Sequence, residues 1–141
     1  MNLYAESSAV LAWLLKEGAE GSIYPLFASA EVVVSSDLTL VECDRTIWRA
    51  VALGRASEEA ASEFRRRLAY FTAPWTFLRL SQDVIERARQ HFPSDPIRAL
   101  DALHVASALA VRASLPSIAM LSLDERVRRV ARSLGLPVLP S

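Results

Sequence analysis

The stretch ALDALHVASALAV, from Ala99 to Val111, carries apolar residues on every side of the helix that it would form. A helix that is apolar all round is a buried helix, so this segment predicts a helix in the interior of the domain. Asp101 lies inside the stretch. Burying an ionised carboxylate without a partner is costly, so the sequence has to supply one.

The composition is that of one globular domain. The chain has 141 residues, of which 52% are hydrophobic, and this is enough for a core, so we expect a single domain over residues 1–141. We find no apolar run that would cross a bilayer and no secretion signal, which favours a cytoplasmic protein without membrane contact. The single cysteine, Cys43, excludes a disulfide framework and a thiolate zinc site, and is expected to be buried.

The charges balance, with 16 basic and 16 acidic residues. A net charge of zero argues against a large basic surface for nucleic acid but leaves room for a local one. Lys16 is the only lysine. The predominance of arginine suits phosphate binding, because the planar guanidinium group matches the oxygens of a phosphate better than the ammonium group of lysine does. Coding bias towards arginine is the ordinary alternative.

Short strand-like runs alternate with helical patterns, which predicts an α/β fold with a parallel-stranded sheet flanked by helices on both faces. Ser57, Ser81 and Asp124 are expected to cap helices, and Asp95-Pro96 is expected to open the helix that contains Asp101. Gly54 and Gly135 are expected to end helices. Strands are expected at about 1–5, 31–35, 77–80, 117–121 and 136–139, and helices at about 7–15, 20–29, 38–53, 58–70, 82–91, from 96 onwards and from 125.

Four acidic residues fall at the edge of this sheet where ligands bind. Glu6 ends the first strand, Glu42 lies one turn into the helix after the second, and Asp124 follows the fourth. Ligand sites of parallel sheets lie beyond the carboxyl ends of the strands. Asp101 joins them if its helix starts at that edge. The candidate catalytic and metal-binding residues are therefore Glu6, Glu42, Asp101 and Asp124.

Each of these acids also has a local interpretation. Glu6 suits an exposed turn or the start of the following helix. Thr39 and Glu42 have the spacing of a capping box, and Asp124 suits an ordinary N-cap. With Asp95 as its cap, Asp101 would fall in the second turn, too deep to cap. It then either pairs with Arg98, three residues earlier, or faces a wet crevice where a divalent cation joins it to other acids.

Other polar residues beside the acids have less specific meanings. His104, one turn after Asp101, is expected to be a structural hydrogen-bonding residue rather than a metal ligand. Ser7, Ser8 and Ser122 flank acidic residues. These hydroxyls either orient carboxylates or water, or cap helices.

Four segments together resemble the PIN domain, and most closely the VapC-type toxins of bacterial toxin–antitoxin pairs. They are LYAESSAVLAWLL, SSDLTLVECDRTIWRA, IRALDALHVASAL and LSLDERVRRVARSLGLPV. The third is the most specific, since it matches the Arg-x-x-Asp-Ala-x-His-x-Ala pattern of the family. The segments occur in the order of the family and span the chain.

The resemblance implies an α/β/α sandwich with an acidic pocket for Mg²⁺ or Mn²⁺ and endoribonuclease activity. Asp101 and Glu6 would be the main metal ligands, and Glu42 and Asp124 would hold waters or a second ion. The resemblance further implies a homodimer and inhibition by a small antitoxin protein. The chain departs from the family in one respect, because Glu6 stands where the first acid is usually aspartate.

This departure keeps a rival interpretation open, namely a PIN-like domain that binds protein or RNA without cutting. A phosphoacceptor domain is disfavoured because Lys16, the only lysine, lies well along the first helix. A dinucleotide-dependent enzyme is disfavoured because no glycine-rich fingerprint follows a strand.

RNA contacts outside the acidic pocket would need cations and aromatic rings. The arginines either bind phosphate or form a solvated helix face, and the tryptophans either stack on bases or pack in the core. The first two helices carry more large apolar residues than a small domain buries, which indicates a dimer or antitoxin surface. The candidates for RNA contact are Arg65, Arg66, Arg126, Arg129, Arg132, Trp13, Trp48 and Trp75.

Overall fold

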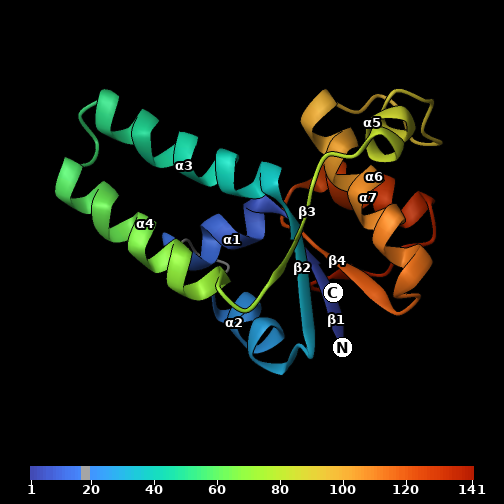
Figure 1. Ribbon diagram of the computed structural model, residues 1–141, viewed down its shortest axis with the longest axis horizontal. Coiled ribbons are helices and arrows are strands. Elements are labelled where there is room, and N and C mark those ends of the chain that lie inside the picture. Colours follow the sequence, from blue (N-terminus) through green and yellow to red (C-terminus); the bar gives the residue numbers. More distant parts are fainter. Residues whose placement is uncertain (17–19) are drawn as a thin grey trace.

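The computed structural model describes residues 1–16 and 20–141, and within them five parallel strands form one sheet. The strand order is β3-β2-β1-β4-β5, so the first strand lies at the centre (Figure 1). Tyr4 of β1 pairs with Val34 of β2 on one side and with Met120 of β4 on the other. The strands are β1 (Asn2–Ala5), β2 (Val32–Ser36), β3 (Thr76–Leu78), β4 (Ile118–Leu121) and β5 (Val138–Leu139).

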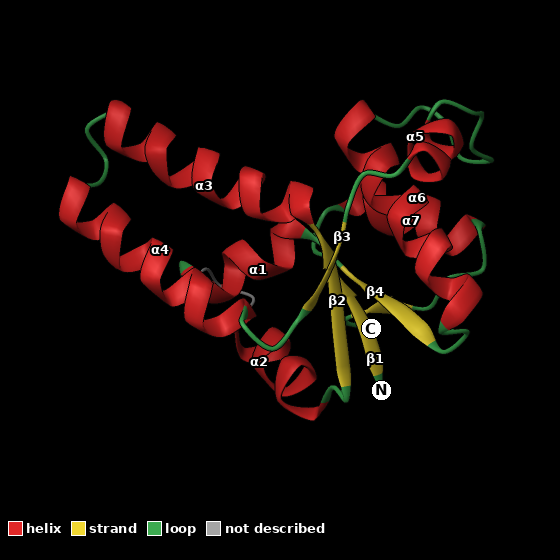
Figure 2. Cartoon of the chain, viewed as in Figure 1, coloured by secondary structure: helices red, strands yellow, loops and turns green. Residues whose placement is uncertain are grey.

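Helices cover both faces of the sheet, as Figures 1 and 2 show, with the first four in the chain on one side and the last three on the other. This arrangement confirms the predicted fold class. No helix of the described ranges is long and apolar enough to cross a membrane. The helices in these ranges are α1 (Ser7–Leu14), α2 (Glu20–Ser29), α3 (Asp37–Ala52), α4 (Glu58–Thr72), α5 (Gln82–Ala88), α6 (Ala99–Ser114) and α7 (Glu125–Ser133).

The central strand β1 divides the core between the two faces. Successive side chains of a strand point to opposite faces, and Leu3 and Ala5 pack with α1 while Tyr4 packs with Val105 and Ala108 of α6. All three β1 side chains are fully buried. The strand is therefore covered on both faces, as expected for a parallel sheet.

Several predicted helix ends are confirmed. The side chains of Ser57, Ser81 and Asp124 accept hydrogen bonds from the first-turn backbone of α4, α5 and α7. Gly54 and Gly135 lie just beyond α3 and α7 with φ of 70° and 77°. Glycine adopts this left-handed conformation without the steric penalty of a Cβ atom.

The predicted start of the helix around Asp101 is wrong. The helix α6 begins at Ala99 with Arg98 as its N-cap, because Asp95 and Pro96 are held by other contacts. The Asp95 carboxylate accepts a bond from the backbone of the loop at Phe92 (2.8 Å). The carbonyl of Pro96 accepts one from α7 (3.1 Å). Asp101 consequently lies in the first turn of α6, not the second.

The helix α6 is also less completely buried than its apolar sequence predicts. Seven of its residues are buried, but Leu100 is 48% exposed and Ala110 is exposed. The exposed positions lie near the two ends, where the sheet and α5 no longer cover the helix. The first turn, which carries Asp101, is therefore open to solvent on one side.

Candidate functional site

The strand order places one candidate site at the carboxyl ends of β1 and β4. The chain runs outward from β1 to β2 and β3 and then crosses to β4 on the other side of β1. This reversal creates a crevice between the ends of the two strands, where open parallel sheets bind their ligands. Glu6 directly follows β1, and its backbone N–H donates to the carbonyl of Leu121 in β4 (3.0 Å). Asp124 follows β4 by three residues.

Glu6 is held inside this crevice by three serine hydroxyls. Ser7 donates to its Oε1 atom (2.7 Å), and Ser122 (2.7 Å) and Ser8 both donate to its Oε2 atom. Glu6 is only 4% exposed, so its interpretation as a surface turn residue is wrong. The serines orient a carboxylate, which is one of the two roles that the sequence left open for them.

Glu42 is held by a chain of hydrogen bonds that begins in the core. It bonds the Nε2 atom of His104, and the Nδ1 atom of His104 lies 2.8 Å from the hydroxyl of Tyr4. Burial raises the pKa of Tyr4 well above its ordinary value, so its hydroxyl keeps its proton. When the Tyr4 hydroxyl donates to Nδ1, the Nε2–H group of His104 donates to the carboxylate, and all three groups are satisfied.

This contact overturns the capping-box interpretation of Glu42. The N-cap of α3 is Ser36, and Thr39 accepts a hydrogen bond from Ser35 (2.8 Å) instead of capping a helix. His104 is fully buried with both ring nitrogens bonded. It is therefore the structural hydrogen-bonding residue that the sequence predicts. Tyr4, its partner, was not among the candidate residues.

Asp101 differs from these two acids because no hydrogen bond or ion pair reaches its carboxylate within residues 1–16 and 20–141. The predicted alternative of a pair with Arg98 is therefore not formed there. Burial raises the pKa of Asp101, and the negative charges of Asp124, Glu6 and Glu42 raise it further. Asp101 thus lies within electrostatic reach of the other three predicted acids.

Asp124 has both a structural contact and a free oxygen. Its Oδ1 atom accepts from the backbone N–H groups of Arg126 (2.9 Å) and Val127 (3.2 Å), which confirms the N-cap. Over the described part of the chain, nothing bonds its Oδ2 atom. Of the neighbouring charges, that of Asp124 raises the pKa of Asp101 the most. The charges of Asp101 and Asp124 therefore repel each other, and each side chain has a carboxylate oxygen that no described residue bonds.

The donor set of the site suits a hard divalent cation by its chemistry, since carboxylate and hydroxyl oxygens are the ligands that Mg²⁺ and Mn²⁺ prefer. No group of three or more His, Cys, Asp or Glu residues stands ready to hold a metal in residues 1–16 and 20–141. Glu6 and Glu42 are engaged with the serines and His104. This leaves Asp101 and Asp124, and Mg²⁺ is commonly bound through one or two carboxylates and several waters.

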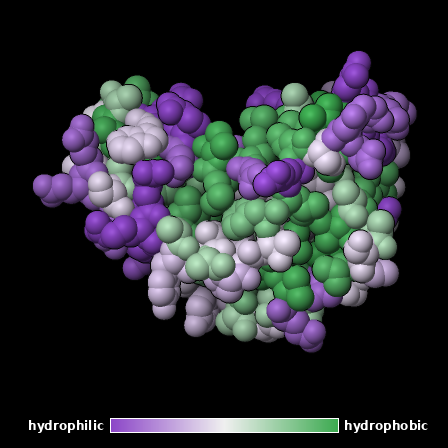
Figure 3. Space-filling model, in the orientation of Figure 1, coloured by the Kyte–Doolittle hydropathy of each residue, from purple (hydrophilic) through white to green (hydrophobic). Residues whose placement is uncertain are grey.

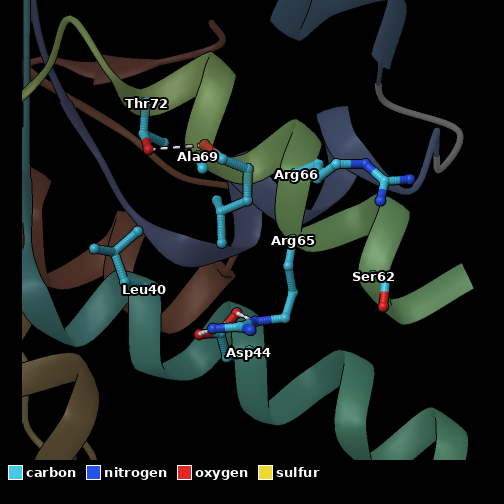
Figure 4. A pocket seen from close by; sticks show the side chains of 8 residues that line it. Leu40, Asp44, Ser62, Arg65, Arg66, Ala69 and Thr72 are labelled. Atoms are coloured by element: carbon cyan, nitrogen blue, oxygen red, sulfur yellow. Dashed lines mark hydrogen bonds and ion pairs between the residues drawn. The ribbon is translucent and has the colours of Figure 1, made fainter. Parts of the chain in front are cut away.

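Most of the arginines proposed for RNA contact have partners within the protein. Arg65 bonds Asp44 with both its Nε (3.3 Å) and its Nη2 (3.5 Å), and Arg66 bonds Glu63. Figure 4 shows Arg65 reaching across the cavity between α3 and α4 to Asp44, while Arg66, which also lines the cavity, extends away from Asp44. In α7, Arg132 lies 3.5 Å from Glu125. These pairs agree better with solvated helix faces than with phosphate sites.

Two of the tryptophans, Trp13 and Trp75, belong to an aromatic cluster, and the third packs in the core. Trp13 stacks on Tyr24 with ring centroids 5.0 Å apart, and Trp75 stacks on Phe27 at 5.4 Å. Trp48 packs against the core formed by α1, α3 and α4. All three are partly buried, which favours the packing interpretation. Cys43 is fully buried in the same core, as predicted.

The sequence profile of the PIN domain matches residues 3–133, which is nearly the whole chain. The chain belongs to the PIN domain family. Each of the four acids lies within the matched residues of this PIN domain. No protein with a curated description matches the chain.

Solved structures share the fold of this PIN domain at low sequence identity. VapBC2 from Rickettsia felis, bound to a DNA fragment from its promoter, superposes with a TM-score of 0.65 at 13% identity, covering 98% of this chain and 97% of the other. VapC20 from Mycobacterium tuberculosis, a toxin that cleaves the sarcin-ricin loop, gives a TM-score of 0.64 at 18% identity, covering 90% and 93%. These likenesses concern the fold.

Proposed function

We propose that this PIN domain is a divalent-metal-dependent endoribonuclease and the toxin of a toxin–antitoxin pair, acting as a single domain in the cytoplasm. The observation that carries the proposal is the electrostatic coupling of Asp101 to Asp124, Glu6 and Glu42 at the carboxyl ends of the central strands. Like charges gathered this way repel one another unless a cation joins them. Family membership and the VapC20 neighbour, a toxin that cleaves the sarcin-ricin loop, support RNA as the substrate.

The four acids take different roles in this proposal. Asp101 and Asp124 hold Mg²⁺ or Mn²⁺, because they have carboxylate oxygens without protein partners. Glu6 and Glu42, fixed by the serines and His104, add negative charge and accept hydrogen bonds from water. When bound, the metal lowers the pKa of water and offsets charge on the phosphate. The protein residues position the phosphodiester and the water.

Cleavage of a labelled single-stranded RNA tests this proposal directly. The intact protein should cleave with Mg²⁺ or Mn²⁺ and not in excess EDTA, and Asp101→Asn should lower the rate by about 10²-fold or more. Asp83→Asn is the matched control, since Asp83 lies in the first turn of α5 as Asp101 lies in that of α6. Equal cleavage in EDTA, or equal loss in both variants, would refute the assigned site.

A second candidate function is a silent PIN domain that binds without cutting. The full engagement of Glu6 by three hydroxyls favours it, because this carboxylate then has little left for a metal. Titration with Mn²⁺ by calorimetry separates the two functions. An active domain binds Mn²⁺ as it stands, whereas a silent domain binds only after Glu6→Asp restores the shorter acid.

An antitoxin partner and a homodimer belong to the same proposal. The VapBC2 neighbour is a complex of two proteins, and the described surface has exposed aromatic residues over α2 and α4. Tyr24 is 55% exposed and Tyr70 is 87% exposed, and Tyr70 lines a hollow together with Phe27, Phe71 and Trp75. Light scattering tests the dimer, and co-purification with the product of a neighbouring reading frame tests the antitoxin.

A further inference from the structure

A small cleft lies beside the acidic site where the loop before α6 meets α7. It has a volume of about 200 Å³ and is lined by Pro96, Ile97, Arg98 and Arg126. A water molecule occupies about 30 Å³ of liquid, so the cleft has room for a hydrated phosphate group but not for a protein segment. Two of its four lining residues are arginines, which gives it a positive charge next to a cluster of acids.

The wall of the cleft is held in place by the protein. Arg129 of α7 donates from its Nη2 atom to the carbonyls of Ser94 (3.3 Å) and Pro96 (3.1 Å). Asp95 accepts a hydrogen bond from the backbone of Phe92 (2.8 Å). These contacts fix the loop before α6 against α7, so the backbone from which the two cleft arginines extend is held in place before any ligand arrives.

The two cleft arginines are available for an anion. Arg98 and Arg126 are exposed, and no ion pair or hydrogen bond engages either guanidinium across the described ranges 1–16 and 20–141. Arg65 and Arg66, by contrast, are paired with carboxylates. An unpaired arginine presents a planar fork of donors that matches the oxygens of a phosphate.

The cleft also lies where a substrate strand would pass. Arg98 is the N-cap of α6, one turn before Asp101, and Arg126 follows Asp124 by two residues and bonds it through its backbone (2.9 Å). The acids repel an RNA strand, and two adjacent cations reduce that repulsion. Figure 3 shows a hollow on the viewed face between the α3–α4 part and the α5–α7 part of the molecule, with apolar residues along it.

We propose that Arg98 and Arg126 bind a backbone phosphate of single-stranded RNA next to the bond that is cut, with Pro96 and Ile97 contacting the adjoining sugar. This inference rests on the proposed ribonuclease function and adds a substrate subsite to it. An acidic protein segment is the rival occupant. RNA is favoured because Arg98 and Arg126 lie three and two residues from Asp101 and Asp124, the acids of the proposed ribonuclease site.

Binding of a fluorescent single-stranded RNA tests the subsite without cleavage. The measurement uses the Asp101→Asn protein in Mg²⁺ and follows anisotropy over a series of KCl concentrations. Each phosphate contact on a single strand contributes about −0.7 to the slope of log K against log salt. Adding Arg98→Ala and Arg126→Ala should reduce the magnitude of the slope by about 0.7. Arg55→Ala, an exposed arginine in the loop between α3 and α4, should leave it unchanged.

A second variant carries Arg98→Lys and Arg126→Lys. Lysine keeps the charge but loses the fork, so the slope should stay while the affinity falls. An unchanged slope in the alanine variant, or an equal loss in Arg55→Ala, would overturn the subsite. So would weakened binding of a protein partner with RNA binding intact. If the intact protein still cleaves RNA in any of these cases, the ribonuclease proposal stands alone; if it neither binds nor cleaves RNA, both fail.

Discussion

Shortening Glu6 to aspartate, the acid more usual in the family, is expected to destabilise this protein. The change withdraws the carboxylate by about 1.5 Å, the length of one C–C bond. Hydrogen bonds that are now 2.7 Å long, from Ser7 and Ser122, would then exceed the range in which they form. A hydrogen bond to a charged group contributes about 1.5–3 kcal/mol, and one buried methylene about 0.8 kcal/mol.

Loss of one to two of the three serine contacts, together with the methylene, therefore predicts that Glu6→Asp lowers the free energy of unfolding by about 2–7 kcal/mol. Urea denaturation followed by tryptophan fluorescence measures this by linear extrapolation. Glu59→Asp is the control, because Glu59 is exposed on α4 and should change stability by less than about 0.5 kcal/mol.

A double-mutant cycle measures the coupling between Glu6 and Ser122. Ser122→Ala alone should cost about 1.5–3 kcal/mol, because it removes a buried donor to a charged acceptor. In the Glu6→Asp background the same change should cost at least about 1 kcal/mol less, since the two groups no longer touch. Additive effects, or a Glu6→Asp protein as stable as the original, would mean that the serines do not hold this carboxylate.

Three further predictions concern groups that are partly or fully buried. Asp101→Asn should increase the free energy of unfolding at pH 7, because burial and like charges raise the pKa of Asp101. The stability of the original protein should fall as the pH rises from about 3.9, the ordinary aspartate pKa, towards the raised value. Urea titrations should show that the two proteins become equally stable below about pH 3.9. His104→Leu should cost about 2–5 kcal/mol by leaving Glu42 and Tyr4 without partners, against about 1 kcal/mol for Tyr4→Phe. Cys43 is fully buried and its pKa is raised to about 12, so a thiol reagent at pH 8 should label it only when urea unfolds the protein; rapid native labelling would contradict its burial.

Local signals explain why much of the fold could be predicted. Ser57, Ser81 and Asp124 cap their helices through backbone groups two or three residues away, so the information lies within one turn of sequence. The alternation of strands and helices fixes the fold class in the same way. The predicted opening of α6 failed because the carbonyl of Pro96 is bonded by Arg129, 33 residues later. A contact at that separation leaves no local pattern.

The candidate site could likewise be predicted only where its signals are local in the sequence. The acids could be placed at the strand ends because Glu6 follows β1 directly and Asp124 follows β4 by three residues. Their partners could not be assigned, because Ser122 meets Glu6 across 116 positions and His104 meets Glu42 across 62. The strand order that brings β1 beside β4 decides the first contact, and hydrophobic patterning does not specify strand order.

The acids differ in the hydrogen-bond partners that the protein gives them, and this difference is the strongest physical reason to place a ligand at this edge of the sheet. The carboxylates of Glu6 and Glu42 accept hydrogen bonds from serine hydroxyls and from His104. The carboxylate of Asp101 receives no hydrogen bond or ion pair from the described residues, and burial and three neighbouring carboxylates raise its pKa while the charge of His104 alone lowers it. A domain selected for stability alone would gain by replacing Asp101 with asparagine, and residues that carry such a cost collect at functional sites. The aspartate inside an apolar helix is therefore best explained by a positively charged ligand that the protein chain itself does not provide.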